Sequence, residues 1–456
     1  MRNLDCDVLV VGGGSAGFGA ALAAARSGRS VRLIEAGPKI GGVMAACPGM
    51  PWGGGYPLGH SIGGVFEELT RRLADMQPAA AERRPCALEN FGDEVHYDHE
   101  IAVATMVAML EHEGVALHLD TIAGEPAMDA GRIAAVACHD RLGPMTVRAG
   151  MVIDCSGDGD VSVGAGVPYT VGDGRGNMMA VSLTFHMIEA DCDRVFAEGD
   201  PYFRRHAAVG IAEGRLHPDL GKLYLMRGFH PNTVFCNTVT IRGVDGTDPA
   251  AVARATQQGR TRCIQVARFL IDDVPGFEQA RMWNIGPSVG VRETRRMEAL
   301  MQIRGDDLAA GRRFDDGVVA CDNPIDDVMR TSAEMTHDAS VGAGSYYTIP
   351  LRALVPRQIT NLLFAGRLIN ADPVAFASVR GMPQCMAMGH AAGVTAALAL
   401  AAGTAVQHVD PRTVVAALVA QGVRGIGGHP LAAPGPNALE GASRANMSPT
   451  RATEPT

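Results

Sequence analysis

The chain has 456 residues, of which 47% are hydrophobic and 20% charged, and its 40 basic and 49 acidic side chains give a net charge of −9. This length allows two or three domains around a sizeable core. The acidic balance, with no dense basic run, argues against binding to nucleic acid or to an anionic membrane surface. The longest apolar stretch, at 391–402, is too short to span a bilayer.

The ten cysteines are scattered along the chain and form no C-x-x-C pair. This spacing argues against a zinc ribbon, an iron–sulfur cluster and a redox disulfide, so no metal site is expected. The first predicted strand begins within ten residues of Met1, which leaves no room for a signal peptide. Together with thiols that are read as reduced, this predicts a cytoplasmic location.

The first predicted elements form one β-α-β unit. An apolar run at 8–11 predicts a strand buried on both faces. The alanine-rich stretch at 15–27 predicts a helix, and a second apolar run at 31–34 predicts the next strand.

A glycine motif lies between the first strand and the helix. Gly12, Gly14 and Gly17 have the G-x-G-x-x-G spacing that allows a tight turn, close approach of a pyrophosphate and close helix packing. Glu35 ends the second strand, where a carboxylate accepts hydrogen bonds from an adenosine ribose. The unit therefore predicts a dinucleotide site, against the alternative of a nucleotide-free crossover that needs three glycines.

Further elements are predicted up to residue 164. A stretch at 41–64 rich in glycine and proline predicts a long functional loop, in which Cys47 and His60 are either near a cofactor or plain loop residues. Beyond the loop, the patterns predict helices at 65–76 and 98–113, with Asp98 as N-cap of the second, then strands at 115–119, 133–138, 145–148 and 151–155.

The β-α-β rhythm stops near residue 165. Strands at 181–187 and 234–241 and a helix at 249–271 predict a separate α+β domain. A strand at 359–365 and a long helix from about 380 to 402 then return to the first style. We therefore predict one α/β domain formed by 1–164 and 341–405, an inserted substrate or cap domain at 165–340, and an extension at 406–456 that is disordered past about 426.

Motifs across residues 5–405 resemble those of a known family. They are VVGGGSAG at 10–17, Glu35 with the Gly41-Gly42 pair, Tyr97-Asp98, DCSGDGD at 154–160, GVRETRR at 290–296, NLLFAGR at 361–367 and RGMPQCMAMGHAAG at 380–393. The chain resembles FAD-dependent oxidoreductases of the glutathione-reductase-type fold. Within these it is most similar to a bacterial group distantly related to fumarate reductase and ketosteroid dehydrogenase flavoproteins. The resemblance implies a Rossmann-like FAD-binding domain with an inserted cap domain.

The resemblance implies FAD as cofactor, with its pyrophosphate on the glycine loop and its ribose on Glu35. The helix that opens near Gly381 is implied to point its N-terminus at the flavin, where it stabilises the negative charge of the reduced ring. The implied FAD-binding residues are Gly12, Gly14, Ser15, Ala16, Gly17, Glu35, Ala36, Gly41, Gly42, Ile122, Ser156, Gly157, Asp158, Gly366, Arg367, Gly381 and Met382.

The sequence departs from some flavoproteins in one respect. No second G-x-G-x-x-G follows a later strand, because SGDGD at 156–160 lacks the spacing. A dedicated NAD(P)H domain is therefore not expected, and a pyridine-nucleotide disulfide reductase is disfavoured. Covalent attachment of FAD through His60 is an alternative that its sequence context does not match. The resemblance implies a small-molecule substrate and leaves the electron acceptor and the oligomeric state unknown.

Three residues are candidates for catalysis. Arg292 lies in a basic cluster with Arg295 and Arg296, which as a helix would turn Arg292 and Arg296 toward a substrate carboxylate. The alternative is an ion-pair network with neighbouring acids. Arg380 stands at the helix start that should face the flavin. The resemblance places Tyr347 on the substrate side, where it donates a proton or holds a carbonyl; the alternative is packing at the domain seam.

The leading hypothesis is an FAD enzyme that transfers a hydride between flavin N5 and a small organic substrate, for which a carboxylate-bearing compound is one option. One alternative is a flavin-dependent monooxygenase, which needs a flavin reduced by NAD(P)H. A second, from a different class, is an FAD-binding protein without turnover.

Overall fold

The computed structural model describes residues 2–88, 91–328, 336–338, 341 and 345–432. Its main sheet has the strand order β6-β2-β1-β9-β8-β7, with β20 also paired to β9. Parallel pairs join β1 to β2 and β9, β2 to β6, and β9 to β20, while β7, β8 and β9 are antiparallel. The strands are β1 (Arg2–Val11), β2 (Val31–Ile34), β6 (Ala116–His118), β7 (Ile122–Asp129), β8 (Arg132–Asp140), β9 (Gly143–Asp154) and β20 (Leu362–Phe364). The predicted α/β class with a parallel-strand sheet is confirmed.

Strand β9 joins two strands that the sequence pattern separates. Its first part pairs with β8 and its last part with β20, while β1 pairs along nearly its whole length. Met145 and Val147 are buried among side chains of β8, whereas Val152 and Ile153 lie in the parallel part of the sheet. A single strand that serves two pairing modes therefore looks like two strands in sequence.

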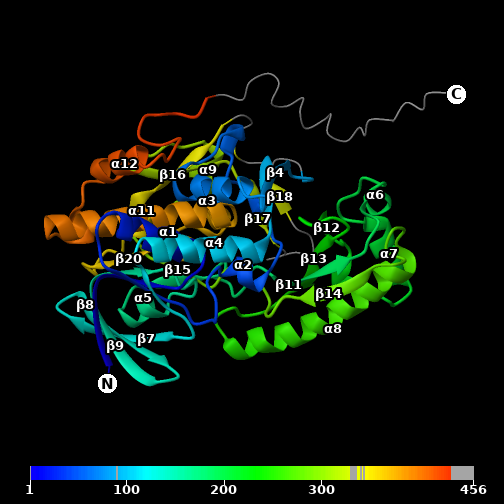
Figure 1. Ribbon diagram of the computed structural model, residues 1–456, viewed down its shortest axis with the longest axis horizontal. Coiled ribbons are helices and arrows are strands. Elements are labelled where there is room, and N and C mark those ends of the chain that lie inside the picture. The colour runs from blue at the N-terminus through cyan, green and yellow to red at the C-terminus, as the bar shows by residue number, and fades with distance from the viewer. Residues whose placement is uncertain (1, 89–90, 329–335, 339–340, 342–344, 433–456) are drawn as a thin grey trace.

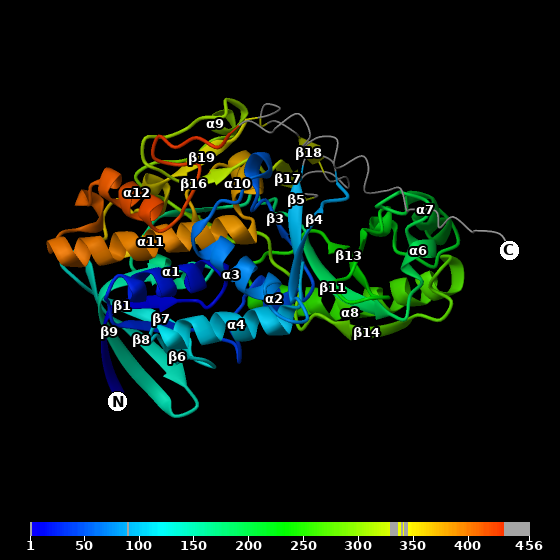
Figure 2. The same cartoon turned by 45° about the horizontal axis from the view of Figure 1, so that its top comes forward.

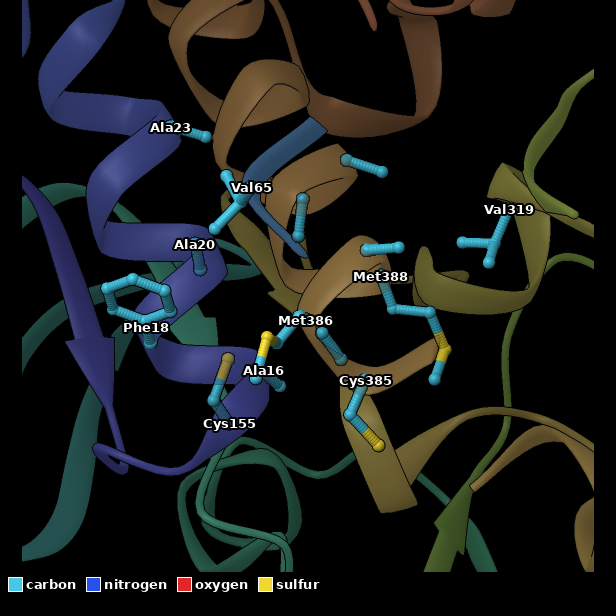
Figure 3. Packing of buried hydrophobic residues seen from close by; sticks show 14 of the residues in the cluster. Ala16, Phe18, Ala20, Ala23, Val65, Cys155, Val319, Cys385, Met386 and Met388 are labelled. Atoms are coloured by element: carbon cyan, nitrogen blue, oxygen red, sulfur yellow. The ribbon is translucent and has the colours of Figure 1, made fainter. Parts of the chain in front are cut away.

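Helices α1 (Ser15–Arg26) and α11 (Met382–Ala402) form the centre of the first lobe, by which we mean the main sheet and the helices on it (Figures 1 and 2). Small residues let them approach: a Cβ on Gly389 would overlap the Ala16 carbonyl oxygen, and one on Gly19 would overlap that of Met386. Figure 3 shows Ala16 and Ala20 of α1 next to α11, with Met386 beside Ala16. The two helix N-termini are thereby held in a fixed relation.

Helix α11 is long and apolar enough to cross a membrane by length and composition alone. However, 78% of its apolar window is buried within the fold, so it is a core helix. The same core includes α3 (Gly64–Ala74), α4 (His99–His112) and α12 (Pro411–Ala420). The Asp98 carboxylate caps α4 by accepting from the backbone N–H groups of Glu100 and Ile101, as predicted.

A second lobe has its own sheet and core. Its antiparallel strands have the order β12-β13-β11-β14, and α6, α7 and α8 lie beside them (Figure 1). A separate cluster of buried apolar side chains comes from these strands and helices. The elements are β11 (Val181–Ile188), α6 (Cys192–Val195), α7 (Arg204–Ala212), β12 (Leu225–Arg227), β13 (Val234–Ile241), α8 (Pro249–Asp273) and β14 (Arg281–Ile285). This lobe lies inside the predicted cap region, whose boundaries stay a prediction.

Shorter elements complete the structure, and many of them pack on the core of the first lobe. Trp52 and Val95 belong to this core, and so, from 303 onward, do Ile303, Val319 and Cys321. The shorter elements are α2 (Val43–Ala46), β3 (Trp52–Gly53), β4 (Ala81–Pro85), β5 (Asp93–Tyr97), α5 (Asp160–Gly164), β10 (Tyr169–Val171), β15 (Arg295–Met297), α9 (Gly305–Ala309), β16 (Gly317–Cys321), β17 (Ile325–Asp327), β18 (Thr336–Asp338), β19 (Tyr347–Pro350) and α10 (Pro373–Val379).

Two expectations about local structure are wrong. The segment 290–296 is not a helix, because its end pairs as β15 with β10. Helix α10 lies where a loop is predicted, and it begins with an Asp N-cap followed by proline, at Asp372. Helix α12 begins in the same way at Asp410, within the predicted C-terminal extension. The disorder expected past about 426 stays a prediction, since residues 433–456 lie outside the described residues.

We predict that Gly389→Ala lowers stability, because its methyl group would overlap the Ala16 carbonyl oxygen and push α1 and α11 apart. Overpacking of this kind costs on the order of 1–3 kcal/mol. Urea unfolding of the apoprotein measures the loss. Ala401→Ser, at the exposed end of the same helix, is the control and should unfold like wild type. Equal unfolding midpoints for Gly389→Ala and wild type would contradict the close helix contact.

Candidate functional site

A long cavity of about 520 Å³ runs between the lobes at the carboxyl ends of the parallel strands. Its wall includes the glycine loop after β1, Glu35 after β2, the 155–160 loop after β9 and the 365–367 turn after β20. Ligands of open α/β sheets bind at this edge because adjacent strand ends leave a crevice there. Residues 246–252 and 288–291 close the cavity from the side of the second lobe.

The glycine loop can exist only without side chains. Gly12 has a φ of +96°, and a Cβ there would lie 2.5 Å from the Cys155 carbonyl oxygen. A Cβ on Gly17 would overlap the Gly12 carbonyl oxygen. Gly14 is the N-cap of α1 and provides no side-chain cap, so the first N–H groups of this helix are available to an anion beside it.

Glu35 is held in position by the backbone. Its Oε2 accepts a hydrogen bond from Gly13 N at 2.7 Å and its Oε1 accepts one from Gly37 N at 2.8 Å. Each carboxylate oxygen has two lone pairs, so each can accept a further hydrogen bond. Glu35 lines the long cavity, and its geometry therefore suits a diol such as a ribose.

The loop at 156–160 depends on the buried carboxylate of Asp154. This carboxylate accepts hydrogen bonds from the backbone N–H and the hydroxyl of Ser156 at 3.1 and 2.7 Å, and from those of Ser162 at 2.9 and 2.7 Å. Burial has the larger effect and raises the pKa of Asp154 above its usual range, while these hydrogen bonds act in the opposite direction. Thr294 Oγ1 donates to Gly157 O at 2.7 Å, which ties the loop to the segment before β15.

Arg367 lies across this loop. It is 3.7 Å from the Asp158 carboxylate, and its guanidinium occupies the space that a Cβ on Gly157 would need. Its Nη1 is buried and has no hydrogen-bond partner within the part of the chain that the structure describes. Arg367 lines the long cavity, and an unpaired guanidinium N–H there suits an oxygen of an anionic ligand.

The structure brings most of the predicted FAD-binding residues to the long cavity. Gly17, Ala36, Gly41, Ile122 and Gly381 are not part of its described wall. Gly17 acts in packing, and the Ile122 side chain on β7 is 62% exposed. Wall residues that sequence reasoning missed are Val43, Ala46, Cys155, Asp160, Gly246, Thr247, Pro249, Val252, Ser288, Val289, Gly290, Val291, Arg295, Ala365 and Cys385.

A smaller cavity of about 230 Å³ adjoins the long one. The two share wall residues, namely Val43, Gly290, Val291, Arg367, Arg380 and Met382. The described wall of the small cavity carries three arginines, Arg292, Arg367 and Arg380, against one carboxylate, Asp326. Positive charge is therefore in excess around this cavity.

The predicted arginines come together there from different lobes. Arg292 follows the second lobe in sequence, and its Nη1 donates to Ala180 O at 2.6 Å and to Ser182 Oγ at 2.9 Å. Burial, followed by the nearby charge of Arg380, lowers the pKa of Arg292 to about 10. Arg380 occupies the C-cap position of α10, and its Nη2 donates to the Asp326 carboxylate at 3.0 Å. Arg292 thus remains charged at neutral pH and faces the cavity with neutral hydrogen-bond partners.

The other two arginines of the basic cluster form ion pairs, and Arg295 also belongs to the wall of the long cavity. Arg296 pairs with Glu293 at 3.1 Å, and Arg295 binds Asp160 at 2.8 Å and stands over the ring of Tyr169. Because the segment is extended, Arg292 and Arg296 do not share a helix face. For Arg295 and Arg296, the structure agrees with the alternative of an ion-pair network with neighbouring acids.

Tyr347 is fully buried and lies behind the described wall of the small cavity. Its hydroxyl is 3.0 Å from Cys321 Sγ and 2.7 Å from Ser378 Oγ, and Ser378 itself lines the cavity. Tyr347 therefore reaches the small cavity only through its hydrogen bond to Ser378, and its predicted contact with substrate stays a prediction. Cys47 lines the small cavity, while His60 belongs to the described wall of neither.

A family model described as FAD dependent oxidoreductase matches residues 7–418. The chain belongs to this family. It is therefore an FAD-dependent oxidoreductase, and its cofactor is FAD. The finer resemblance to fumarate reductase and ketosteroid dehydrogenase flavoproteins goes beyond this match.

Individual relatives are more distant. A segment of 77 residues, 17% of this chain, is 40% identical to 4-oxocyclohex-2-ene-1-carboxylate 5-dehydrogenase from Sinomonas cyclohexanicum and spans 13% of that protein. Among solved structures, a geranylgeranyl bacteriochlorophyll reductase-like protein from Thermoplasma acidophilum has a TM-score of 0.47 at 14% identity, with 96% of each chain covered. Aklavinone-11 hydroxylase with FAD and aklavinone has a TM-score of 0.49 at 13% identity, covering 88% of this chain and 64% of that one.

The long cavity fits FAD on the observations above. The glycine loop would hold the pyrophosphate, Glu35 the ribose, and the unpaired Nη1 of Arg367 an oxygen of the cofactor. The described His, Cys, Asp and Glu side chains form no group of three or more suited to a metal ion.

We predict that purified enzyme is yellow with one FAD per chain, and that Glu35→Ala weakens FAD binding. A hydrogen bond to a charged group contributes roughly 1.5–3 kcal/mol, so the dissociation constant of FAD should rise about 10- to 150-fold. Titration of the apoprotein with FAD measures this change. The control is Glu111→Ala, at an exposed position on α4. Unchanged FAD affinity in Glu35→Ala would remove Glu35 from the ribose site.

Proposed function

We propose that the enzyme is a dehydrogenase or reductase that acts on a small carboxylate-bearing molecule held in the small cavity. FAD, when bound, accepts or donates a hydride at its N5 atom. The observation that supports this proposal is the excess of arginine around the small cavity, where it adjoins the long cavity that fits FAD.

The arginines suit a carboxylate for geometric and electrostatic reasons. A guanidinium presents two parallel N–H groups that match the two oxygens of a carboxylate. Asp326 offsets the charge of Arg380, while Arg292 is held by neutral groups and keeps its charge for a ligand. A carboxylate at Arg292 would anchor one end of the substrate and fix the distance of its reacting carbon from the cofactor.

Other residues have supporting roles in this proposal. Ser378 accepts from Tyr347 and donates to Asn323 O at 2.5 Å, which ties the end of α10 to the loop between β16 and β17, just before Asp326. Tyr347 is thus a positioning residue for Arg380, which follows α10 directly. The relative that shares a 77-residue segment is named as a dehydrogenase of an oxo-carboxylate, and that name agrees with hydride transfer.

We further propose the glutathione-reductase-type subtype, the distant relation to fumarate reductase and ketosteroid dehydrogenase flavoproteins, and the cytoplasmic location. Their support is the motif set at 10–17, 154–160, 290–296, 361–367 and 380–393 and the cysteine pattern. The monooxygenase alternative differs in needing NAD(P)H to reduce the flavin.

We predict that NADH and NADPH reduce the flavin far more slowly than about 10 per second, a typical turnover rate. The reason is that the sequence contains one dinucleotide fingerprint, which FAD would use. Anaerobic stopped-flow absorbance measures the reduction, and a panel of small carboxylic acids serves as the comparison. Rapid reduction by either nucleotide would favour the monooxygenase, whereas bleaching by a carboxylic acid supports the dehydrogenase.

We predict that Arg292→Ala and Arg380→Ala keep FAD but lower kcat/KM for the bleaching acid about 10- to 150-fold, equivalent to the roughly 1.5–3 kcal/mol of a charged hydrogen bond. Lysine at either position should restore activity only in part, since an ammonium lacks the planar fork. Arg412→Ala, at a side chain that is 90% exposed, is the control. A folded, yellow Arg292→Ala variant with full activity would exclude Arg292 from the substrate site.

A further inference from the structure

Strand β13 changes face at one point along its length. Val234 and Cys236 point into the core of the second lobe, and so do Val239 and Ile241. In a regular strand, every second side chain points to the same face, so residue 238 should follow Val234 and Cys236 into the core. Residue 239 does so instead, and the pattern therefore shifts by one residue at Asn237. The register with β11 shifts at the same place, between Leu183 and Phe185. Such bulges re-aim side chains next to active sites.

The bulge leaves Asn237 in the wall of the small cavity. Its Oδ1 is buried without a hydrogen-bond partner among the described residues, and its Nδ2 lies 4.0 Å from the Met50 sulfur, a weak acceptor. Whichever way the amide is turned, one strong polar group remains unpaired. An unpaired buried polar group costs about 1–3 kcal/mol, so a ligand that pairs with it gains affinity.

Neighbouring polar side chains of this wall are already engaged. Ser182 accepts from Arg292, Ser378 bonds Tyr347 and Asn323 O, and the Nδ2 of Asn323 donates to Ser378 O. Asn237 therefore differs from them, because its amide has no strong hydrogen-bond partner among the described residues. Ser182 and Asn237 come from the adjacent strands β11 and β13, so the amide lies on the same sheet that supports Arg292.

The size of the small cavity limits what lies between the arginines and Asn237. An apolar cavity of about 150 Å³ holds one benzene molecule. The small cavity of about 230 Å³ therefore has room for on the order of ten non-hydrogen atoms. A molecule of this size that places a carboxylate at the arginines still has a second end within the cavity.

We propose that Asn237 is a specificity-determining residue whose amide either accepts at Oδ1 from a hydroxyl of the substrate or, turned over, donates from Nδ2 to a carbonyl oxygen, which makes the substrate class a small oxo- or hydroxycarboxylate. This inference rests on the proposed function, since the arginines supply the carboxylate end. A site with a dedicated hydrogen-bonding group rejects analogues that lack the matching polar atom, because the group is then left unpaired.

The test uses FAD-loaded enzyme and follows the flavin absorbance during anaerobic titration with 4-oxocyclohexanecarboxylate, cyclohexanecarboxylate and cyclohexanone. Wild type should bind the oxo acid at least about tenfold more tightly than cyclohexanecarboxylate. Asn237→Leu, close to isosteric, should bind the two acids alike and should bind cyclohexanone more weakly than wild type does. Asn237→Ala repeats the comparison in case the leucine disturbs folding, which FAD content reports.

The control is Thr238→Val, in the same bulge, whose hydroxyl bonds Lys222 O and lies outside the described wall of the cavity. It should keep the discrimination between the two acids. Discrimination that persists in both Asn237 variants, or that is absent from wild type, overturns the inference. If cyclohexanone alone binds wild type and the Asn237 variants weaken it, the carboxylate proposal fails while the role of Asn237 is supported. If none of the three probes binds, both fail.

Discussion

The close contact between α1 and α11 is the constraint on which the rest of the site depends. The N-terminus of α1 faces the glycine loop of the long cavity, and Met382 at the N-terminus of α11 belongs to the wall where the two cavities meet. Because Gly19 and Gly389 let the backbones touch, the two helix starts are separated by a fixed distance. The N-terminal ends of both helices, where a helix dipole is positive, thus lie in the wall of the long cavity.

The segment 290–296 connects the chemistry of the two lobes. Arg292 faces the small cavity, Thr294 and Arg295 bind the loop at 156–160, and Arg296 is buried in a pair with Glu293. One short extended segment therefore reaches the small cavity, the loop at 156–160 and the protein interior. Arginines that are close together in sequence therefore need not form a single binding patch.

Much of the first lobe could be predicted from sequence because local signals agree there. The apolar strands, the glycine spacing and the Asp98 cap each depend on nearby residues, and the structure confirms them. The approach of Arg292 to Arg380 depends instead on contacts between distant segments. The basic cluster pointed to Arg292, and the helix start implied by the resemblance pointed to Arg380. The wall at 246–252 and the shift at Asn237 had no local signature, while the Asp-Pro starts of α10 and α12 had one that was overlooked.

The wall of the long cavity comes from both lobes, and the first turn of α8 closes it opposite the glycine loop. A molecule as long as FAD that fills this cavity touches both lobes at once. Whatever binds the folded state and not the unfolded chain stabilises the folded state, so FAD bound here also stabilises the packing of one lobe on the other.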